Sequence, residues 1–312
     1  MSGASLGGDR QVRVPATAPQ AHNGNVARPA ERLLENVPGE FYIDASCIDC
    51  ETCMVLAPAT FAESAAELAF VHRQPQSAAE RDRALMALVS CPTASIGTLG
   101  RRDASAAARA FPAPFSDNVY TCGYASPRSY GAQSWLLRRP QGNVLIDSPR
   151  AAAPLLSGMA RLGGVRLMLL THQDDVADHA RFRERFACDR VMHEGDLSSD
   201  TAGVERRVAG YEPVELAPDL LILPVPGHTR GSIALLHGDI LFTGDHLWAE
   251  PDGTLAASRS VCWWSWPEQV RSLQRLLDYD FRMVLPGHGR PFVAETPAAA
   301  RRALEALLER VR

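Results

Sequence analysis

One stretch limits the fold and chemistry of this chain more than any other. In it, a largely apolar run is followed at once by a dense group of histidines and aspartates. Residues 165–170 are apolar apart from Arg166, and residues 171–179 contain two histidines and three aspartates. Such a pattern is typical of a buried strand that opens into a loop and then a helix. Imidazole nitrogens and carboxylates are metal ligands, so the stretch predicts a metal centre at the end of a strand.

Three shorter motifs further along the chain offer the same chemistry. They read PGHT at residues 226–229, TGDH at residues 243–246 and PGHG at residues 286–289. Each follows an apolar run, and in each a glycine precedes the histidine or aspartate, which lets the backbone approach a small site closely. Four motifs of this kind in one chain favour a single shared site.

This ordered set resembles the metallo-β-lactamase superfamily over residues 115–312. The chain departs from the family's pattern at one place: Asp174 stands where the second histidine is found, and residues 175 and 176 read as an insertion after it. The resemblance implies that His172 and His228 hold a first ion and that Asp245 bridges to a second. The second ion would be held by Asp178, His179 and His288.

Asp174 is the candidate for the missing ligand of the first ion. It follows His172 by two residues, so in an extended loop both side chains point the same way. If the loop bulges, Asp175 serves instead, or neither does. A carboxylate shifts the preference of the site from zinc towards iron or manganese. Asp174 and Asp178 are also the candidate catalytic residues, and one or two divalent ions are expected, with zinc favoured.

A second ligand pattern lies near the N-terminus. Cys47, Cys50 and Cys53 are spaced by three residues, and Cys91 is followed by a proline. This resembles a small bacterial-type ferredoxin with a single [4Fe-4S] cluster, in which a distant Cys-Pro supplies the fourth thiolate. A structural zinc site and inert cysteines are the alternatives, although zinc knuckles use paired C-x-x-C units.

The domain organisation follows from these patterns. We expect a disordered tail at residues 1–38, a ferredoxin-like domain at 39–98, a linker at 99–114 and a metallo-β-lactamase-like domain at 115–312. Short apolar runs alternating with amphipathic helical stretches predict an α+β fold. The four-layer αββα sandwich is implied by the resemblance. Serines that begin capping boxes at Ser77 and Ser265 each predict a helix start.

Composition limits the partners. The net charge is −4, which gives no reason to expect binding to nucleic acid or to an anionic membrane. All 32 basic residues are arginine, so Schiff-base chemistry on a lysine is excluded. Seven cysteines, four of them in one metal-type pattern, indicate a reducing compartment, and we expect a cytoplasmic protein. The expected partners are a small-molecule substrate and a redox partner for the cluster.

Three classes of function fit this combination of motifs. The resemblance implies a metal-dependent hydrolase that uses metal-bound hydroxide on an ester, thioester or lactone. The attached cluster and the carboxylate at Asp174 instead favour an iron-dependent oxidoreductase that receives electrons through the cluster. A non-catalytic redox sensor or electron-transfer protein is the third alternative.

Overall fold

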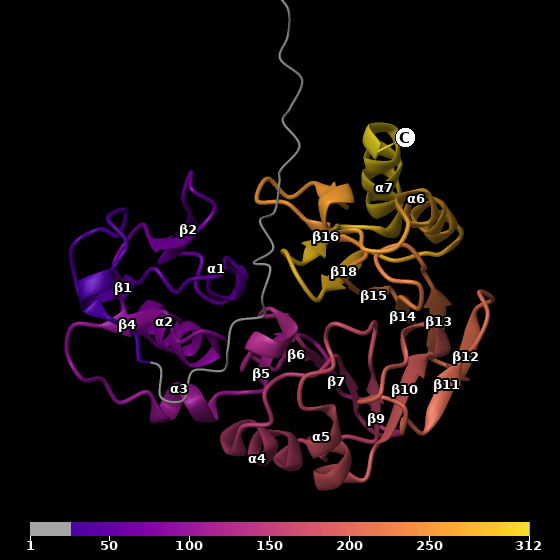
Figure 1. Cartoon of the computed structure of the whole chain (residues 1–312), viewed down its shortest axis with the longest axis horizontal. Helices are drawn as coiled ribbons and strands as arrows, with labels where there is room; N and C mark the ends of the chain where they lie inside the picture. The colour runs from indigo at the N-terminus through magenta and orange to yellow at the C-terminus, as the bar shows by residue number, and fades with distance from the viewer. Residues whose placement is uncertain (1–25, 312) are drawn as a thin grey trace, which may run out of the picture.

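The computed structural model describes residues 26–311 (Figure 1). The expected disordered tail lies outside the described residues as far as residue 25. Residues 26–38, expected to belong to it, instead pack on the first domain, which corrects the boundary. The Tyr42 hydroxyl donates to the Ala27 carbonyl at 2.8 Å, and Asn36 Oδ1 accepts from the backbone of Ile43 and Val71.

The first domain is built from short strands around two helices. Strand β1 (Phe41–Ile43) pairs antiparallel with β4 (Ile96–Thr98), and β2 (Phe61–Glu63) forms a hairpin with β3 (Ala69–Val71). The helices are α1 (Thr52–Leu56) and α2 (Ala78–Ser90). The Ser77 side chain accepts from the backbone of Glu80, as the capping box predicts, and α2 ends where Cys91 begins the return to β4.

The second domain contains two mixed sheets. The seven-stranded sheet has the order β11-β10-β9-β8-β7-β6-β5, and the six-stranded sheet has the order β12-β13-β14-β15-β18-β19. The strands of the first sheet are β5 (Ala113–Ser116), β6 (Val119–Thr121), β7 (Trp135–Leu137), β8 (Val144–Ile146), β9 (Leu167–Leu169), β10 (Asp189–His193) and β11 (Arg206–Val208). Those of the second are β12 (Val214–Ala217), β13 (Leu220–Pro224), β14 (Ile233–His237), β15 (Ile240–Gly244), β18 (Met283–Pro286) and β19 (Phe292–Val293).

The two sheets pack face to face with helices on both outer faces, as Figure 1 shows. Alternate residues of β8 divide between the layers, because Val144 and Ile146 enter the core between the sheets whereas Leu145 enters the outer core. Helices α4 (Ala153–Arg161) and α5 (His179–Phe186) cover the first sheet, and α6 (Trp266–Arg275) and α7 (Pro297–Val311) cover the second. The expected αββα sandwich is confirmed. A small hairpin, β16 (Trp248–Ala249) with β17 (Leu255–Ala256), follows β15.

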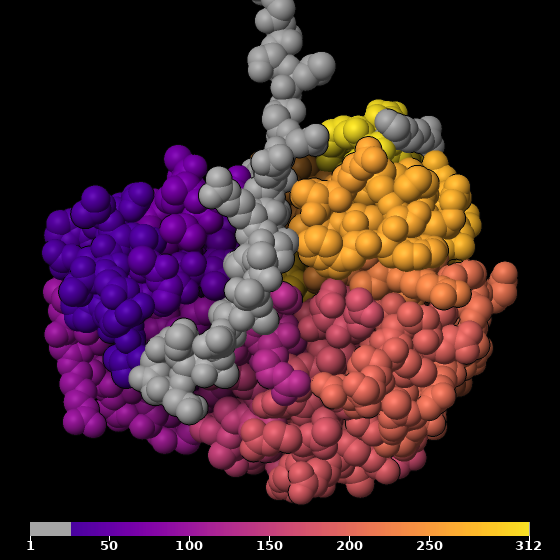
Figure 2. All heavy atoms as spheres, in the orientation of Figure 1, coloured from indigo at the N-terminus to yellow at the C-terminus, as the bar shows by residue number. Residues whose placement is uncertain are grey.

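The segment expected as a linker is part of the folded structure. Helix α3 (Ser105–Arg109) packs against both α2 and α4, and β5 already belongs to the seven-stranded sheet. Buried side chains of the first domain, such as Phe41 and Ala87, form one apolar cluster with Phe111 and with Leu155 of α4. The two domains therefore share a core, and their surfaces are continuous in Figure 2. No described helix has the length and apolar character to cross a membrane.

Candidate metal centre

Four loops at the ends of strands converge on one site. The loop after β9 carries His172, Asp174 and Asp175, and the loop after β13 carries His228. Strands β15 and β18 run parallel, so Asp245 and His288 emerge at the same edge of the second sheet. The six side chains thus come from both sheets and meet where the sheets open.

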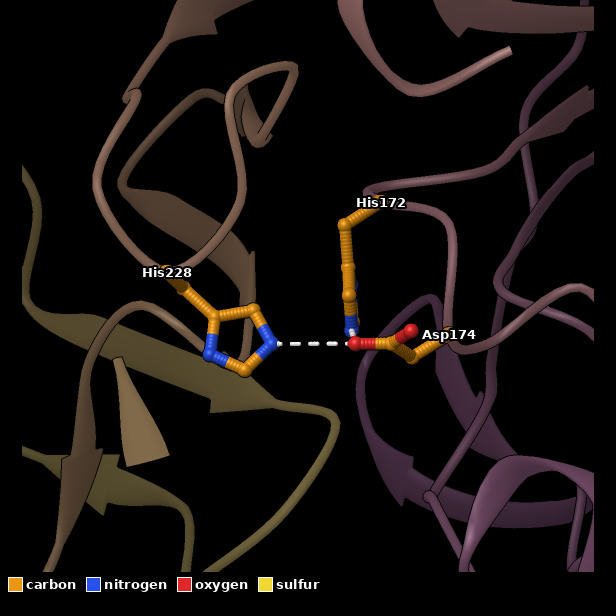
Figure 3. Close-up of side chains that lie close together, drawn as sticks. All are labelled: His172, Asp174 and His228. Carbon is orange, nitrogen blue, oxygen red and sulfur yellow. Dashed lines mark ion pairs between the residues drawn. The ribbon is translucent and has the colours of Figure 1, made fainter. Parts of the chain in front are cut away.

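The first set of donors consists of His172, Asp174 and His228 (Figure 3). The Oδ2 atom of Asp174 lies 3.5 Å from His228 Nε2 and 3.9 Å from His172 Nε2. Both histidine nitrogens are buried and have no hydrogen-bond partner among the described residues. Two donors held at about 2.1 Å from one ion lie at most about 4.2 Å apart, so these separations fit a single metal ion.

The other ring nitrogen of each histidine is engaged, which fixes the tautomer. His228 Nδ1 donates to the carbonyl of Val261 at 2.6 Å. Thr171 Oγ1 lies 2.9 Å from His172 Nδ1 and donates to the buried carboxylate of Asp147, so it accepts from the histidine. A neutral imidazole oriented in this way presents the lone pair of Nε2 to a metal. Asp147 therefore supports the metal loop, and burial raises the pKa of its carboxyl to about 6.

The second set consists of His172, Asp175 and Asp245. His172 Nε2 lies 3.9 Å from Asp175 Oδ2 and 3.6 Å from Asp245 Oδ2. Asp175 is fully buried, and neither of its carboxylate oxygens has a hydrogen-bond partner in the described part of the chain. A Cβ on Gly287 would lie 2.7 Å from Asp245 Oδ1 and 2.8 Å from Asp175 Oδ2, so only glycine leaves room for both carboxylates. His288 completes this side, with Nδ1 at 2.9 Å from both oxygens of Asp245.

The electrostatics of the site favour a bound cation. Burial, reinforced by the charge of Asp245, raises the pKa of Asp175 well above its usual value. Burial acts in the same direction on Asp245, but the neighbouring His288 and His172 outweigh it and hold that pKa well below its usual value. Burial opposes protonation of His288, yet Asp245 raises its pKa to about 10. The carboxylates of Asp174, Asp175 and Asp245 lie close enough to repel one another, and a divalent ion would neutralise their charge.

Two of the expected ligands lie elsewhere. The Nδ1 atom of His179 accepts from Arg190 at 2.9 Å, and Asp178 accepts from the backbone of Ala151 at 2.8 Å while pairing with Arg128 and Arg181. The structure thus does not bring Asp178 and His179 to the metal centre, which corrects their expected roles. The physical reason is their place in the chain, because Asp178 is the N-cap and His179 the first residue of α5, whereas Asp175 lies buried in the preceding loop.

Two positioning residues were not found from the sequence. Asp196 is buried and accepts from the backbone of Gln173, the hydroxyl of Thr229 and the backbone of Gly231, so it joins the two loops of the first donor set. Gln133 donates to the carbonyls of Gly287 and Gly289, both at 2.7 Å, and so brackets His288. Neither residue lies in a recognisable motif. Each contacts loops that are distant in the sequence, so local spacing gives no signal for its role.

The remaining histidines and the tryptophans have separate environments. His193 bonds the backbone of Gly195 and Gly210 and is structural. His246 is fully buried, both its nitrogens are without a described partner, and burial lowers its pKa to about 3. Trp263 is exposed, with its ring 6.1 Å from that of His228, and Trp264 is exposed beside it. Trp248 packs against Gly289.

The four cysteines of the first domain surround one cavity. It is lined by Cys47, Cys50, Cys53 and Cys91 together with apolar and hydroxyl side chains. Burial raises the pKa of Cys47 to about 11 and that of Cys50 to about 12, so these thiols need bound metal to ionise. In the described part of the chain, no three of them offer donor atoms within 4.8 Å of one another. Ligands of a single zinc ion would do so, which makes the cavity fit a larger group such as a cluster.

Together, the sandwich and its histidine–aspartate site define a protein of the αββα class with a candidate metal centre. The family model described as the metallo-beta-lactamase superfamily matches residues 129–288, just over half of the chain, which belongs to that superfamily. The model described as the 4Fe-4S single cluster domain of ferredoxin I matches residues 43–98, and the first domain belongs to that family.

Several known proteins are similar to parts of this chain. A hydroxyacylglutathione hydrolase of Xanthomonas campestris is 31% identical over 46% of this chain and 54% of its own length, and one of Yersinia pestis is 33% identical over 46% and 55%. The chain spans about half the length of these relatives. A metallo-beta-lactamase of Hirschia baltica is 17% identical, covers 64% of this chain and 96% of its own, and has a TM-score of 0.49.

Proposed function

We propose that this protein is a metal-dependent hydrolase of an ester or thioester bond. The observation that carries the proposal is the pair of buried, unpartnered Nε2 atoms of His172 and His228 facing Asp174, among the described residues. Membership of a hydrolase-rich superfamily supports it. The named activity of the relatives, hydrolysis of an acyl group from glutathione, favours a thioester.

The residues of the site fall into two ligand sets and one proton acceptor. His172, His228 and Asp174 would hold one ion, and Asp175, Asp245 and His288 would hold a second. A divalent ion in such a site lowers the pKa of water to about 7 and polarises a carbonyl. Asp174 has the most accessible of the three aspartate side chains, and its neighbour His228 lowers its pKa despite burial. Asp174 is therefore ionised, and because its Oδ2 faces the two histidines, Oδ1 is the oxygen that would accept a proton from an attacking water.

The substrate we propose is a small molecule with an apolar acyl group. Trp263 and Trp264 lie at the mouth of the site, and their backbone amides donate to the carbonyl of His228. Exposed tryptophans beside a polar centre are typical of a surface that binds an apolar group. We further propose that the protein acts in a reducing, cytoplasmic setting, since none of the described cysteines forms a disulfide.

Metal analysis combined with a substrate screen tests the proposed function. Protein purified without oxygen is stripped with a chelator that leaves the visible spectrum of the cluster intact, and Zn²⁺, Mn²⁺ or Fe²⁺ is then restored. Acyl thioesters and aryl esters are assayed at each stage. We expect activity to disappear on stripping and return with metal, and His228→Ala to abolish both binding and turnover. Full activity in the stripped protein would exclude this mechanism.

One observation favours the second candidate, an iron-dependent oxidoreductase. Asp174 supplies a carboxylate where the family has a histidine, and carboxylate-rich sites suit iron and manganese better than zinc. The same metal analysis separates the two functions. Iron as the native metal, with no hydrolysis of any ester or thioester, would favour the oxidoreductase.

A further inference from the structure

The cluster cavity and the metal centre are in contact through one turn of the second domain. Gly131 follows the short helix η2 (Pro127–Ser129) and has a φ of +89°. A Cβ at this position would lie 2.4 Å from Cys50 Cβ and 2.8 Å from Cys50 Sγ. The hydroxyl of Thr52 donates to the Gly131 carbonyl at 3.0 Å. The backbone of Gly131 therefore lies directly against a cluster ligand.

The adjacent residue contacts the metal centre. The carbonyl of Tyr130 accepts from Nε2 of His288 at 3.4 Å, and Nδ1 of the same ring faces Asp245. A histidine that binds a metal through one nitrogen usually donates its other N–H to a carbonyl or carboxylate, and this partner orients the ring. The orienting partner of His288 and the backbone packed on Cys50 are thus neighbouring residues.

Further contacts hold this junction in place. Glu51 pairs with Arg290 at 3.7 Å, and Arg290 also reaches the sulfur of Met54. The junction is rigid because Gln133 fixes both residues flanking His288.

From these contacts we infer that the Tyr130–Gly131 turn couples the redox state of the cluster to the metal centre. An electron taken up by the cluster from a low-potential one-electron donor makes it one unit more negative, and no covalent bond forms or breaks. The added negative charge favours a cation held beside His288. By linkage, a cation in the metal centre makes the cluster easier to reduce by the same factor. The inference rests on the proposed metal centre but not on hydrolysis.

The inference is tested by a redox titration of the full chain. The reduced cluster is followed by electron paramagnetic resonance in protein stripped of the second-domain metal and in protein reloaded with Zn²⁺. We expect Zn²⁺ to bind about tenfold more tightly to the reduced form, within the usual range of coupling between sites. The midpoint potential then rises by about 59 mV on loading, the equivalent of tenfold for one electron.

Variants with matched controls identify the route. Thr52→Val removes the hydroxyl that bonds Gly131 while keeping the shape of the side chain, and the potential shift should fall by at least half. Thr60→Val is its control, because this hydroxyl is buried in the same domain without a described partner. Gly131→Ala should also reduce the shift, since its Cβ overlaps Cys50. Gly253→Ala, with a φ of +82° and no neighbour within 4 Å, controls for backbone strain.

Each outcome decides a separate point. Equal potentials with and without Zn²⁺ in the wild-type chain overturn the coupling. A wild-type shift that persists in full in Thr52→Val overturns the route through the turn, even if Gly131→Ala does not fold. A chain that binds Zn²⁺ and shows the shift but hydrolyses nothing removes the proposed hydrolase activity and leaves the coupling standing.

Discussion

At the scale of single residues, the metal centre depends on which nitrogen of each histidine is free. The Nδ1 atoms of His172 and His228 are bonded to Thr171 and Val261, so each Nε2 faces the site as an acceptor. Because a neutral imidazole has one donor and one acceptor nitrogen, these outer partners decide what the ring presents to a ligand. These hydrogen bonds therefore orient both Nε2 lone pairs towards the site, where a cation would bind.

Asp175 in the metal loop and Asp178 at the start of the following helix give a matched pair of variants. We expect Asp175→Asn to weaken metal binding at the second donor set, because Asp175 is buried beside Asp245 with free oxygens among the described residues. Asp178→Asn should leave the metal content unchanged, since Asp178 bonds Ala151 and lies with Arg128 and Arg181. Metal per chain, measured after dialysis, checks both. Equal losses in the two variants would restore Asp178 as a ligand.

Sequence motifs predicted four of the six converging residues without ambiguity: His172, His228, Asp245 and His288. These follow strands directly, so their positions are determined by where the strands end. Asp174 and Asp175 remained alternatives in the sequence, and the structure brings both to the site. Spacing could not settle this, because the direction of a side chain in a loop depends on contacts such as that of Asp196 with Gln173.

The exposed tryptophan beside His228 tests the proposed substrate class. Trp263→Ala removes an apolar surface next to the site, and burying an aromatic group against it contributes about 2 kcal/mol. We expect KM for an apolar acyl thioester to rise roughly 10-fold or more, with the metal content unchanged. Tyr211→Ala is the control, since Tyr211 is also exposed but stacks on the structural His193. An unchanged KM would place the acyl group elsewhere.

At the scale of elements, the short helix η3 (Glu194–Asp196) connects the loops that carry the first donor set. Asp196→Ala removes a buried carboxylate with three hydrogen-bond donors, so we expect a loss of about 3 kcal/mol in unfolding free energy. Metal binding should weaken as well, because His172 and His228 lose their common anchor. Chemical denaturation and metal titration measure the two effects. The exposed Asp200→Ala should change neither, and a similar loss there would argue against the anchor.

The elements themselves were predicted unevenly. Both capping boxes begin helices as expected, with Ser77 and Ser265 accepting from residues three positions later. Strands β11 and β12 contain no apolar run that would predict them, because they are edge strands whose residues, apart from Val208, are exposed or half-buried. Their pairing depends on the neighbouring strand rather than on local propensity.

At the scale of the whole molecule, we expect the shared core to make the two domains unfold as one unit. Phe111 is fully buried, its ring packs on Tyr124 at 5.6 Å, and it belongs to the apolar cluster that contains both Phe41 and Leu155. The buried guanidinium of Arg150 adds hydrogen bonds to Val89 in the first domain and Ala125 in the second. Loss of either domain exposes apolar surface of the other.

This shared core can be tested with two natural probes. All five tryptophans lie in the second domain, whereas the visible absorbance of a cluster reports on the first. On heating without oxygen, both signals should change at one midpoint. Phe111→Ala should lower that midpoint for both together, since removing a buried phenylalanine costs about 3–5 kcal/mol. Phe115→Ala, at a more exposed ring, should have a smaller effect. Two separate midpoints in the wild-type chain would show that the domains unfold independently and that the core between them contributes little.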